Sequence, residues 1–159
     1  MTGSRKKTEI RAVIDTNIFV PALAYRDTEV RLYNLLLRKC WKVVISEQIV
    51  EEYERVLRKF GQRPAVVQLE LNKLHVSNKY RSCTTTLDEI EQIGDDLSPR
   101  KDRHIIAPCL KRCANVLLTC DGGIHERRQR ILRQCGARVL SMDDAEAELN
   151  VLDDCRPDG

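Results

Sequence analysis

Aromatic side chains are scarce in this chain, and long apolar runs are missing from it. Phe, Trp and Tyr make up 4% of the 159 residues, so we do not expect binding that stacks bases over several rings. No apolar run approaches the roughly 20 residues that a membrane-spanning helix needs. The start of the chain, up to Arg11, is charged and polar, without the apolar core of a signal peptide. We therefore expect a cytoplasmic protein that does not associate with a membrane.

The cysteines lack the close pairing that is typical of zinc sites. The chain has seven of them, an odd number, and no Cys-x-x-Cys pair occurs. In a cytoplasmic protein we expect them to be ordinary buried or half-buried free thiols, because a free Cys behaves as a small apolar side chain.

Composition and charge are those of an ordinary globular protein. Apolar residues make up 42% of the chain and charged residues 32%, which excludes a disordered protein. The net charge is only +3, which does not by itself require a nucleic-acid partner. The length predicts one domain. We expect a disordered basic lead over residues 1–9, the domain over residues 10–149, and a flexible tail over residues 150–159.

Predicted strands alternate with predicted helices along the chain. Apolar runs predict strands at residues 12–15, 41–45, 75–83, 115–121 and 138–140. Apolar spacing and cap residues predict helices at residues 18–25, 28–39, 47–60, 64–74, 103–112, 125–134 and 141–149, with a loop at 84–96. This alternation predicts an α/β fold, a three-layer α/β/α sandwich with a mainly parallel central sheet.

Four carboxylates are expected to meet at one edge of this sheet. Asp15 and Asp121 each end a predicted strand, and Asp102 begins the helix that leads into the second of these strands. Glu52 lies on one shoulder of the predicted helix 47–60, and helical spacing does not distinguish it from Glu54 on the other shoulder. Each acid also has an ordinary alternative role, as a helix cap, a turn residue or a solvated charge.

The expected convergence of these acids predicts a site for a divalent cation. Carboxylates that share one crevice repel each other unless a cation or protons offset their charge. Oxygen ligands favour Mg²⁺ or Mn²⁺ over zinc. Because such an ion can activate water and stabilise the charge on a phosphate, the expected chemistry is metal-dependent hydrolysis of phosphodiesters.

Four short stretches, in this order along the chain, carry a family resemblance. They are residues 13–17 (VIDTN), Ser46 with residues 52–57 (EYERVL), residues 102–107 (DRHIIA) and residues 117–121 (LLTCD). Together they resemble the PIN domain, as found in the toxin ribonucleases of bacterial and archaeal toxin–antitoxin pairs. The resemblance implies an acidic quartet of Asp15, Glu52, Asp102 and Asp121 that holds one or two divalent metals, with Asn17 and Thr119 supporting the site. It also implies RNA as the substrate, a homodimer and, for toxin-type members, an antitoxin protein as a partner.

Basic side chains flank the proposed metal ligands. Arg100, Lys101 and Arg103 adjoin Asp102, while Arg127, Arg128, Arg130 and Arg133 follow Asp121. They are expected to contact RNA phosphates, which supply affinity without reading the base sequence. The alternative is that these arginines form a solvated helix face.

Other function classes compete with a nuclease. A catalytically silent PIN-like module that binds RNA or protein would share the fold, and a Mn²⁺ titration distinguishes it from an enzyme. A phosphoacceptor receiver domain would have an acid pair after the first strand and an acceptor Asp after the third, where this chain has Thr16-Asn17 and Cys83-Thr84. A haloacid-dehalogenase-like phosphatase would have Asp at the position of Asn17.

Overall fold

A five-stranded parallel sheet forms the centre of the molecule. The structure, a computed structural model, describes residues 9–38 and 41–151. The strands are β1 (Arg11–Ile14), β2 (Lys42–Ile45), β3 (Tyr80–Ser82), β4 (Val116–Leu118) and β5 (Arg138–Leu140), in the order β3-β2-β1-β4-β5. The predicted basic lead and tail lie almost entirely in residues 1–8 and 152–159, outside the described residues.

The chain reverses its direction of winding across the sheet at β1. This strand pairs with β2 on one side and with β4 on the other, and Ile14 lies opposite Leu118 in the register. Open α/β sheets bind their ligands beyond the carboxyl ends of the strands at such a reversal point. The residues that follow Ile14 and Leu118 therefore occupy the place where a ligand site is expected.

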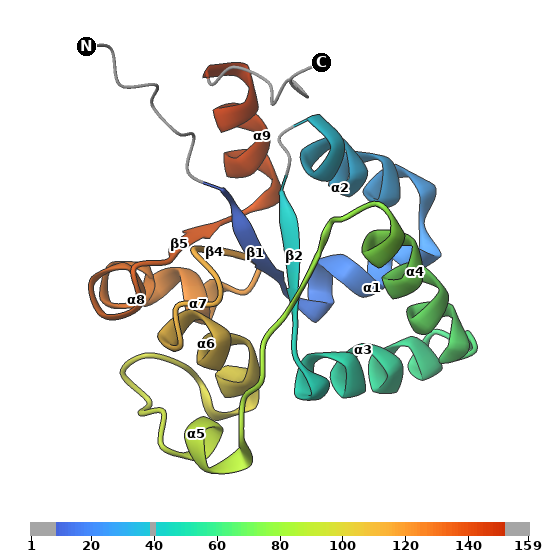
Figure 1. Cartoon of the computed structure of the whole chain (residues 1–159). Helices are drawn as coiled ribbons and strands as arrows, with labels where there is room; N and C mark the ends of the chain where they lie inside the picture. Colours follow the sequence, from blue (N-terminus) through green and yellow to red (C-terminus); the bar gives the residue numbers. More distant parts are fainter. Residues whose placement is uncertain (1–8, 39–40, 152–159) are drawn as a thin grey trace.

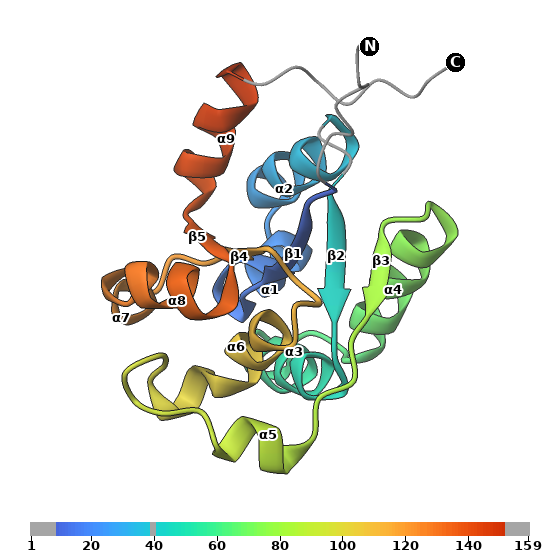
Figure 2. The same ribbon diagram turned by 60° about the vertical axis from the view of Figure 1, so that its left-hand side comes forward.

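Helices cover both faces of the sheet, which confirms the predicted α/β/α sandwich (Figures 1 and 2). One group connects β1 to β3: α1 (Thr16–Ala24), α2 (Arg26–Arg38), α3 (Glu47–Lys59) and α4 (Ala65–Val76). The other lies between β3 and β5: α5 (Leu87–Glu91), the 3-10 turn η1 (Arg100–Asp102), α6 (Arg103–Leu110), α7 (Gly122–Glu126) and α8 (Arg128–Cys135). The chain crosses the sheet in one direction from β1 to β3 and in the other from β3 to β5. Because crossovers between parallel strands are right-handed as a rule, this change of direction places the two groups on opposite faces. The last helix, α9 (Met142–Val151), packs against α2 and β5.

The helix α3 illustrates how the sequence specifies this packing. Ser46 caps it by accepting a hydrogen bond from the Ile49 amide at 3.2 Å, and the apolar stripe through Ile49, Tyr53 and Leu57 is completely buried. The Tyr53 ring stacks on Phe19 of α1, with centroids 4.2 Å apart, and its hydroxyl donates to the carbonyl of Ile14. This helix therefore holds the end of β1 in place.

Most predicted elements differ by a few residues at their ends, and some differ more substantially. The strand predicted at 75–83 is shorter, because α4 continues to Val76 and Asn78 turns the chain with a left-handed φ of 59°. The single basic helix predicted at 125–134 is two helices, α7 and α8, which meet at Arg127. The helix predicted at 18–25 begins two residues earlier, at Thr16, so Pro21 lies beyond its first turn. The loop at 84–96 contains the short helix α5, capped by Thr86 and Glu89.

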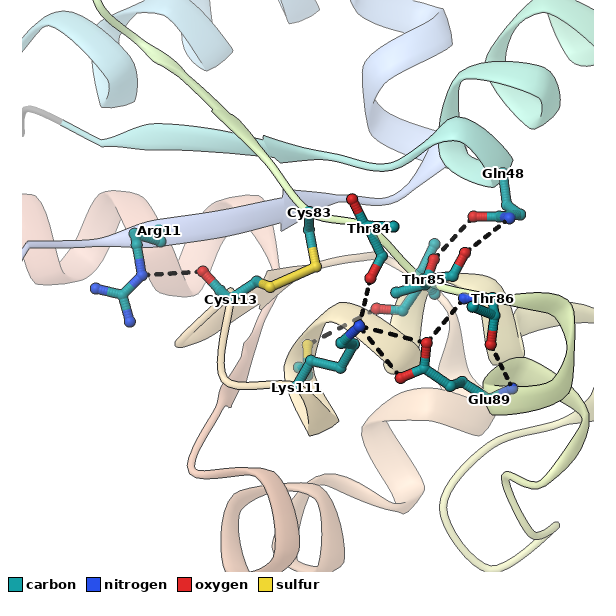
Figure 3. Close-up of a disulfide and its surroundings, with 11 residues drawn as sticks. Arg11, Gln48, Cys83, Thr84, Thr85, Thr86, Glu89, Lys111 and Cys113 are labelled. Atoms are coloured by element: carbon teal, nitrogen blue, oxygen red, sulfur yellow. Dashed lines mark hydrogen bonds and ion pairs between the residues drawn. A yellow bond between two sulfur atoms is a disulfide. The ribbon is translucent and has the colours of Figure 1, made fainter.

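The expectation that all cysteines are free thiols is wrong. Cys83, just after β3, and Cys113, in the turn between α6 and β4, form a disulfide (Figure 3). They are 30 residues apart, and only the crossing of the segment after β3 over the end of α6 brings them together. Cys109, Cys120 and Cys135 are free, and Cys40 and Cys155 lie outside the described residues.

Within the described ranges, no helix has the length and apolar character needed to cross a membrane.

Candidate active site

Asp15 lies at the carboxyl end of β1 in a network of hydrogen bonds. Its Oδ1 accepts from the amide of Thr16 at 2.7 Å, so it caps α1. Its Oδ2 accepts from the Thr119 hydroxyl at 2.6 Å and from Asn17 Nδ2 at 3.2 Å. Burial raises the pKa of the Asp15 carboxyl, and the hydrogen bond from Thr119 opposes this rise. Asp15 therefore does cap a helix, which was its alternative role. Its second oxygen, Oδ2, makes hydrogen bonds to Thr119 and Asn17 that helix capping does not require.

Thr119 joins the ends of β1 and β4. Its side chain is completely buried, and its hydroxyl accepts from the amide of Asp121 at 3.0 Å while donating to Asp15. Asn17 completes the junction, because its Oδ1 accepts from the Cys120 amide at 3.4 Å. The structure therefore brings together four of the six residues predicted for the site: Asp15, Asn17, Thr119 and Asp121.

Asp121 is held at the start of α7. Its Oδ1 accepts from the Ile124 amide at 3.1 Å, and its Oδ2 lies 3.9 Å from Nζ of Lys101. A Cβ at position 123 would lie 3.1 Å from Asp121 Oδ1, so the glycine there leaves room for the carboxylate. Asp121 thus caps a helix, whereas its alternative role was that of a turn residue, and its charge also acts on Asp15 and Asp102.

Asp102 is the acid that helix capping does not explain. It precedes α6, yet its side chain makes no capping hydrogen bond, and its buried Oδ2 has no partner among the described residues. Its pKa is raised to about 6, chiefly because the residue is buried, and further by the negative charges of Asp15 and Asp121. A buried carboxylate oxygen without a donor is costly unless something binds it.

Glu52 stands at the margin of the site. Its charge also raises the pKa of Asp102, so it lies within electrostatic reach of the other acids. Both of its oxygens accept hydrogen bonds from Arg55, three residues further along α3. Glu51, on the side of α3 opposite the apolar stripe, is exposed to solvent.

The donor chemistry of these residues fits a hard divalent cation, although the side chains are not closed around one. Carboxylate oxygens are the ligands that Mg²⁺ and Mn²⁺ prefer, and the free Oδ2 of Asp102 is available as a ligand. In residues 9–38 and 41–151, no three His, Cys, Asp or Glu side chains are placed so that they could hold an ion as they stand. Binding would require Glu52 to leave Arg55.

Sequence reasoning missed three residues beside the site. Tyr53 supports the end of β1 through its hydrogen bond to Ile14. Its position in the apolar stripe of α3 predicts burial but not this hydrogen bond. His104, in the first turn of α6, has a buried Nε2 without a partner among the described residues. Burial lowers the pKa of His104, while the charges of Glu52 and Asp15 oppose that shift. Arg55 was visible only as part of the family motif.

The predicted RNA-contacting residues fall into two groups. Arg103 donates to Asp95 at 2.7 Å and Arg127 to the Asp95 carbonyl at 2.9 Å, so both fasten the loop before η1. Arg103 is nearly buried, with 12% of its side chain exposed. The exposed residues are Arg100, Lys101, Arg128, Arg130 and Arg133. This second group presents its charge to solvent, although Lys101 lies 3.9 Å from Asp121 and Arg128 donates to the carbonyl of His125 at 3.0 Å.

Comparison with known families agrees with this geometry. A family model of the PIN domain matches residues 11–122, more than half of the chain. The chain belongs to the PIN-domain family. The matched range contains all four acids, and the PIN domain is a nuclease-type fold. A search of curated proteins finds no significant match.

Proposed function

We propose that this PIN-domain protein is a divalent-metal-dependent endoribonuclease. Asp15, Glu52, Asp102 and Asp121 would hold Mg²⁺ or Mn²⁺. The unpartnered, buried Oδ2 of Asp102 is the observation that carries the proposal. A carboxylate in that position, with its pKa raised to about 6 by burial and by the charges of Asp15, Asp121 and Glu52, needs a cation to offset its charge near neutral pH.

Each residue has a distinct task in this scheme. A bound divalent cation would supply Lewis acidity for water and for the scissile phosphate. Thr119 and Asn17 orient the Asp15 carboxylate through the hydrogen bonds to its Oδ2. Exposed cations near Asp102 and Asp121, among them Lys101, would position the RNA backbone by contacts with phosphate.

The finer parts of the proposal depend on the family resemblance in the sequence. They are a toxin-type role, a homodimer and an antitoxin protein as a partner. A cytoplasmic location is proposed separately, from the polar start of the chain and its lack of long apolar runs. Disulfides are rare in the reducing cytoplasm, so the Cys83–Cys113 disulfide would call for conditions in which intracellular disulfides persist.

A second candidate function is a binding module that no longer cuts RNA. The pairing of Glu52 with Arg55 favours it, because one of the four acids is already neutralised by the chain itself.

Cleavage of a labelled single-stranded RNA in Mn²⁺ and in EDTA tests the nuclease proposal. We expect cleavage only with the metal, and none in Asp15→Asn, whose fold stays intact or becomes more stable because one buried charge is removed. Glu52→Gln should lose activity, whereas Glu54→Gln, on the other shoulder of the same helix, should keep it. If Mn²⁺ neither raises the melting temperature nor supports cleavage, the binding module is the correct function.

A further inference from the structure

Glu52 and Arg55 form a two-pronged ion pair on α3. Arg55 donates from one terminal nitrogen to Oε1 at 2.6 Å and from Nε to Oε2 at 3.1 Å, so the guanidinium occupies both carboxylate oxygens. The Glu52 side chain is 26% exposed and that of Arg55 is 55% exposed. The carboxylate is thus partly enclosed, while the guanidinium is free to move into solvent.

This pair differs from an ordinary solvated pair on a helix surface, because its charges act on a buried and a half-buried side chain outside α3. The charge of Glu52 raises the pKa of Asp102, and the charge of Arg55 lowers the pKa of His104. Both affected groups lie at the start of α6, which packs against α3. The Arg55 guanidinium therefore lies within electrostatic reach of the start of α6.

A cation that binds Glu52 must displace Arg55 from its carboxylate oxygens. Acids that act on one another's pKa need positive charge nearby, and Arg55 supplies it at Glu52 when no metal is present. A divalent cation that took Glu52 as a ligand would compete with the guanidinium for the same oxygens. It would also repel the guanidinium once bound.

We propose that Arg55 is a positioning residue with two alternative partners, the Glu52 carboxylate in the metal-free protein and a phosphate of the RNA once a divalent cation has taken that carboxylate. This inference rests on the nuclease function proposed above. The guanidinium fork suits both partners, since carboxylate and phosphate accept the same pair of parallel hydrogen bonds. Release of Arg55 would couple metal binding to the capture of substrate.

Binding of Mn²⁺ to the full-length protein, measured by isothermal titration calorimetry, tests whether Arg55 competes with the metal for Glu52. Arg55→Gln removes the competitor, and we expect it to tighten Mn²⁺ binding about two- to fivefold, the range for loss of an exposed ion pair. Arg55→Lys keeps the charge but loses the fork, and it should tighten binding at least twofold. Arg58→Gln, one turn further along the same helix and exposed, should bind Mn²⁺ like the unmodified protein. Melting curves in EDTA would verify that each variant is folded.

Binding of a fluorescent single-stranded RNA tests whether Arg55 contacts a phosphate once the metal is bound. Phosphorothioate linkages keep the backbone charge of this RNA and resist hydrolysis. Without Mn²⁺, Arg55→Gln should not change the affinity, because the guanidinium is engaged with Glu52. With saturating Mn²⁺, it should weaken binding and reduce the slope of log affinity against log salt by about 0.7, the value for one phosphate contact on a single strand.

The outcomes separate this inference from the nuclease proposal. If the unmodified protein binds no Mn²⁺, both fail together. If it binds Mn²⁺ with an affinity that Arg55→Lys leaves unchanged, the nuclease proposal stands, and the alternation of Arg55 between two partners is wrong. An equal loss of RNA affinity with and without Mn²⁺ would likewise overturn it.

Discussion

The hydroxyl of Thr119 donates a hydrogen bond to Oδ2 of Asp15 at 2.6 Å, across the junction between β4 and β1. Both residues are buried, and they are 104 positions apart in the chain. This contact links the two strands at the point where the winding of the sheet reverses. It also holds the carboxylate of Asp15 in a fixed orientation.

Replacing Thr119 by Val should therefore damage stability and metal binding together. The valine keeps the shape but leaves Asp15 Oδ2 and the amide of Asp121 without this partner. We expect the free energy of unfolding to fall by about 1 to 3 kcal/mol, the cost of leaving buried polar groups unsatisfied. Urea unfolding in EDTA measures this loss. Thr119→Ser keeps the hydroxyl and should lose much less, so equal losses in the two variants would contradict the role given to the hydrogen bond.

The pH dependence of stability should reveal the strained carboxylate of Asp102. Its pKa in the folded protein is about 6, against an ordinary value of 3.8, so the folded state binds its proton more tightly than the unfolded chain. Stability from this group is therefore present at low pH and is lost as the pH rises from about 4 to about 6.

Asp102→Asn removes this penalty. In EDTA at pH 8, we expect the variant to unfold with a free energy about 1 to 3 kcal/mol higher than the unmodified protein. The difference should shrink towards zero as the pH falls below about 4, because the carboxyl is then protonated in the folded state and increasingly protonated in the unfolded chain. Denaturant titrations at several pH values would measure it, and a difference that grew on acidification would be incompatible with this account.

The disulfide between Cys83 and Cys113 should contribute substantially to stability. A loop closed over 30 residues is worth about 3 to 4 kcal/mol on the chain-entropy estimate. We expect a reductant to lower the free energy of unfolding by that amount, with no effect of reductant on a Cys83→Ala/Cys113→Ala protein. Hydrogen bonds from the Cys83 amide to Ile45, at 2.8 Å, and from Arg11 to the Cys113 carbonyl, at 2.9 Å, hold both ends, so the reduced protein should still fold.

Cys120→Ser provides the matched control, because Cys120 is a free, exposed thiol. Reductant should destabilise that variant as much as it destabilises the unmodified protein.

Two arginines that look equivalent in the sequence should behave differently when replaced. Arg103→Gln breaks the bonds to Asp95 and to the Glu91 carbonyl, and should lower the free energy of unfolding by about 1 to 2 kcal/mol. Arg130→Gln, on the exposed face of α8, should leave stability unchanged and weaken RNA binding in a salt-dependent way. Thermal melting and RNA-binding titrations of both variants measure these effects. Loss of stability in Arg130→Gln would contradict the purely RNA-contacting role given to Arg130.

The sequence by itself determined the layered fold and the edge at which the acids gather. Apolar runs that end in Asp15 and Asp121 predict parallel strands, and the carboxyl ends of parallel strands lie at one edge of a sheet. The buried stripe of α3 was equally readable, because it depends only on helical spacing.

Only the tertiary structure decided the features that depend on contacts between distant segments. The rotation of α3, set by Tyr53 against Phe19 and Ile14, brings Glu52 within reach of Asp102. The crossing of the segment after β3 over the end of α6 joins Cys83 to Cys113. The position of Asp95 turns Arg103 inward, while Arg130 stays in solvent. Local spacing carries no information about such contacts, because each is determined by how two separately formed elements pack together.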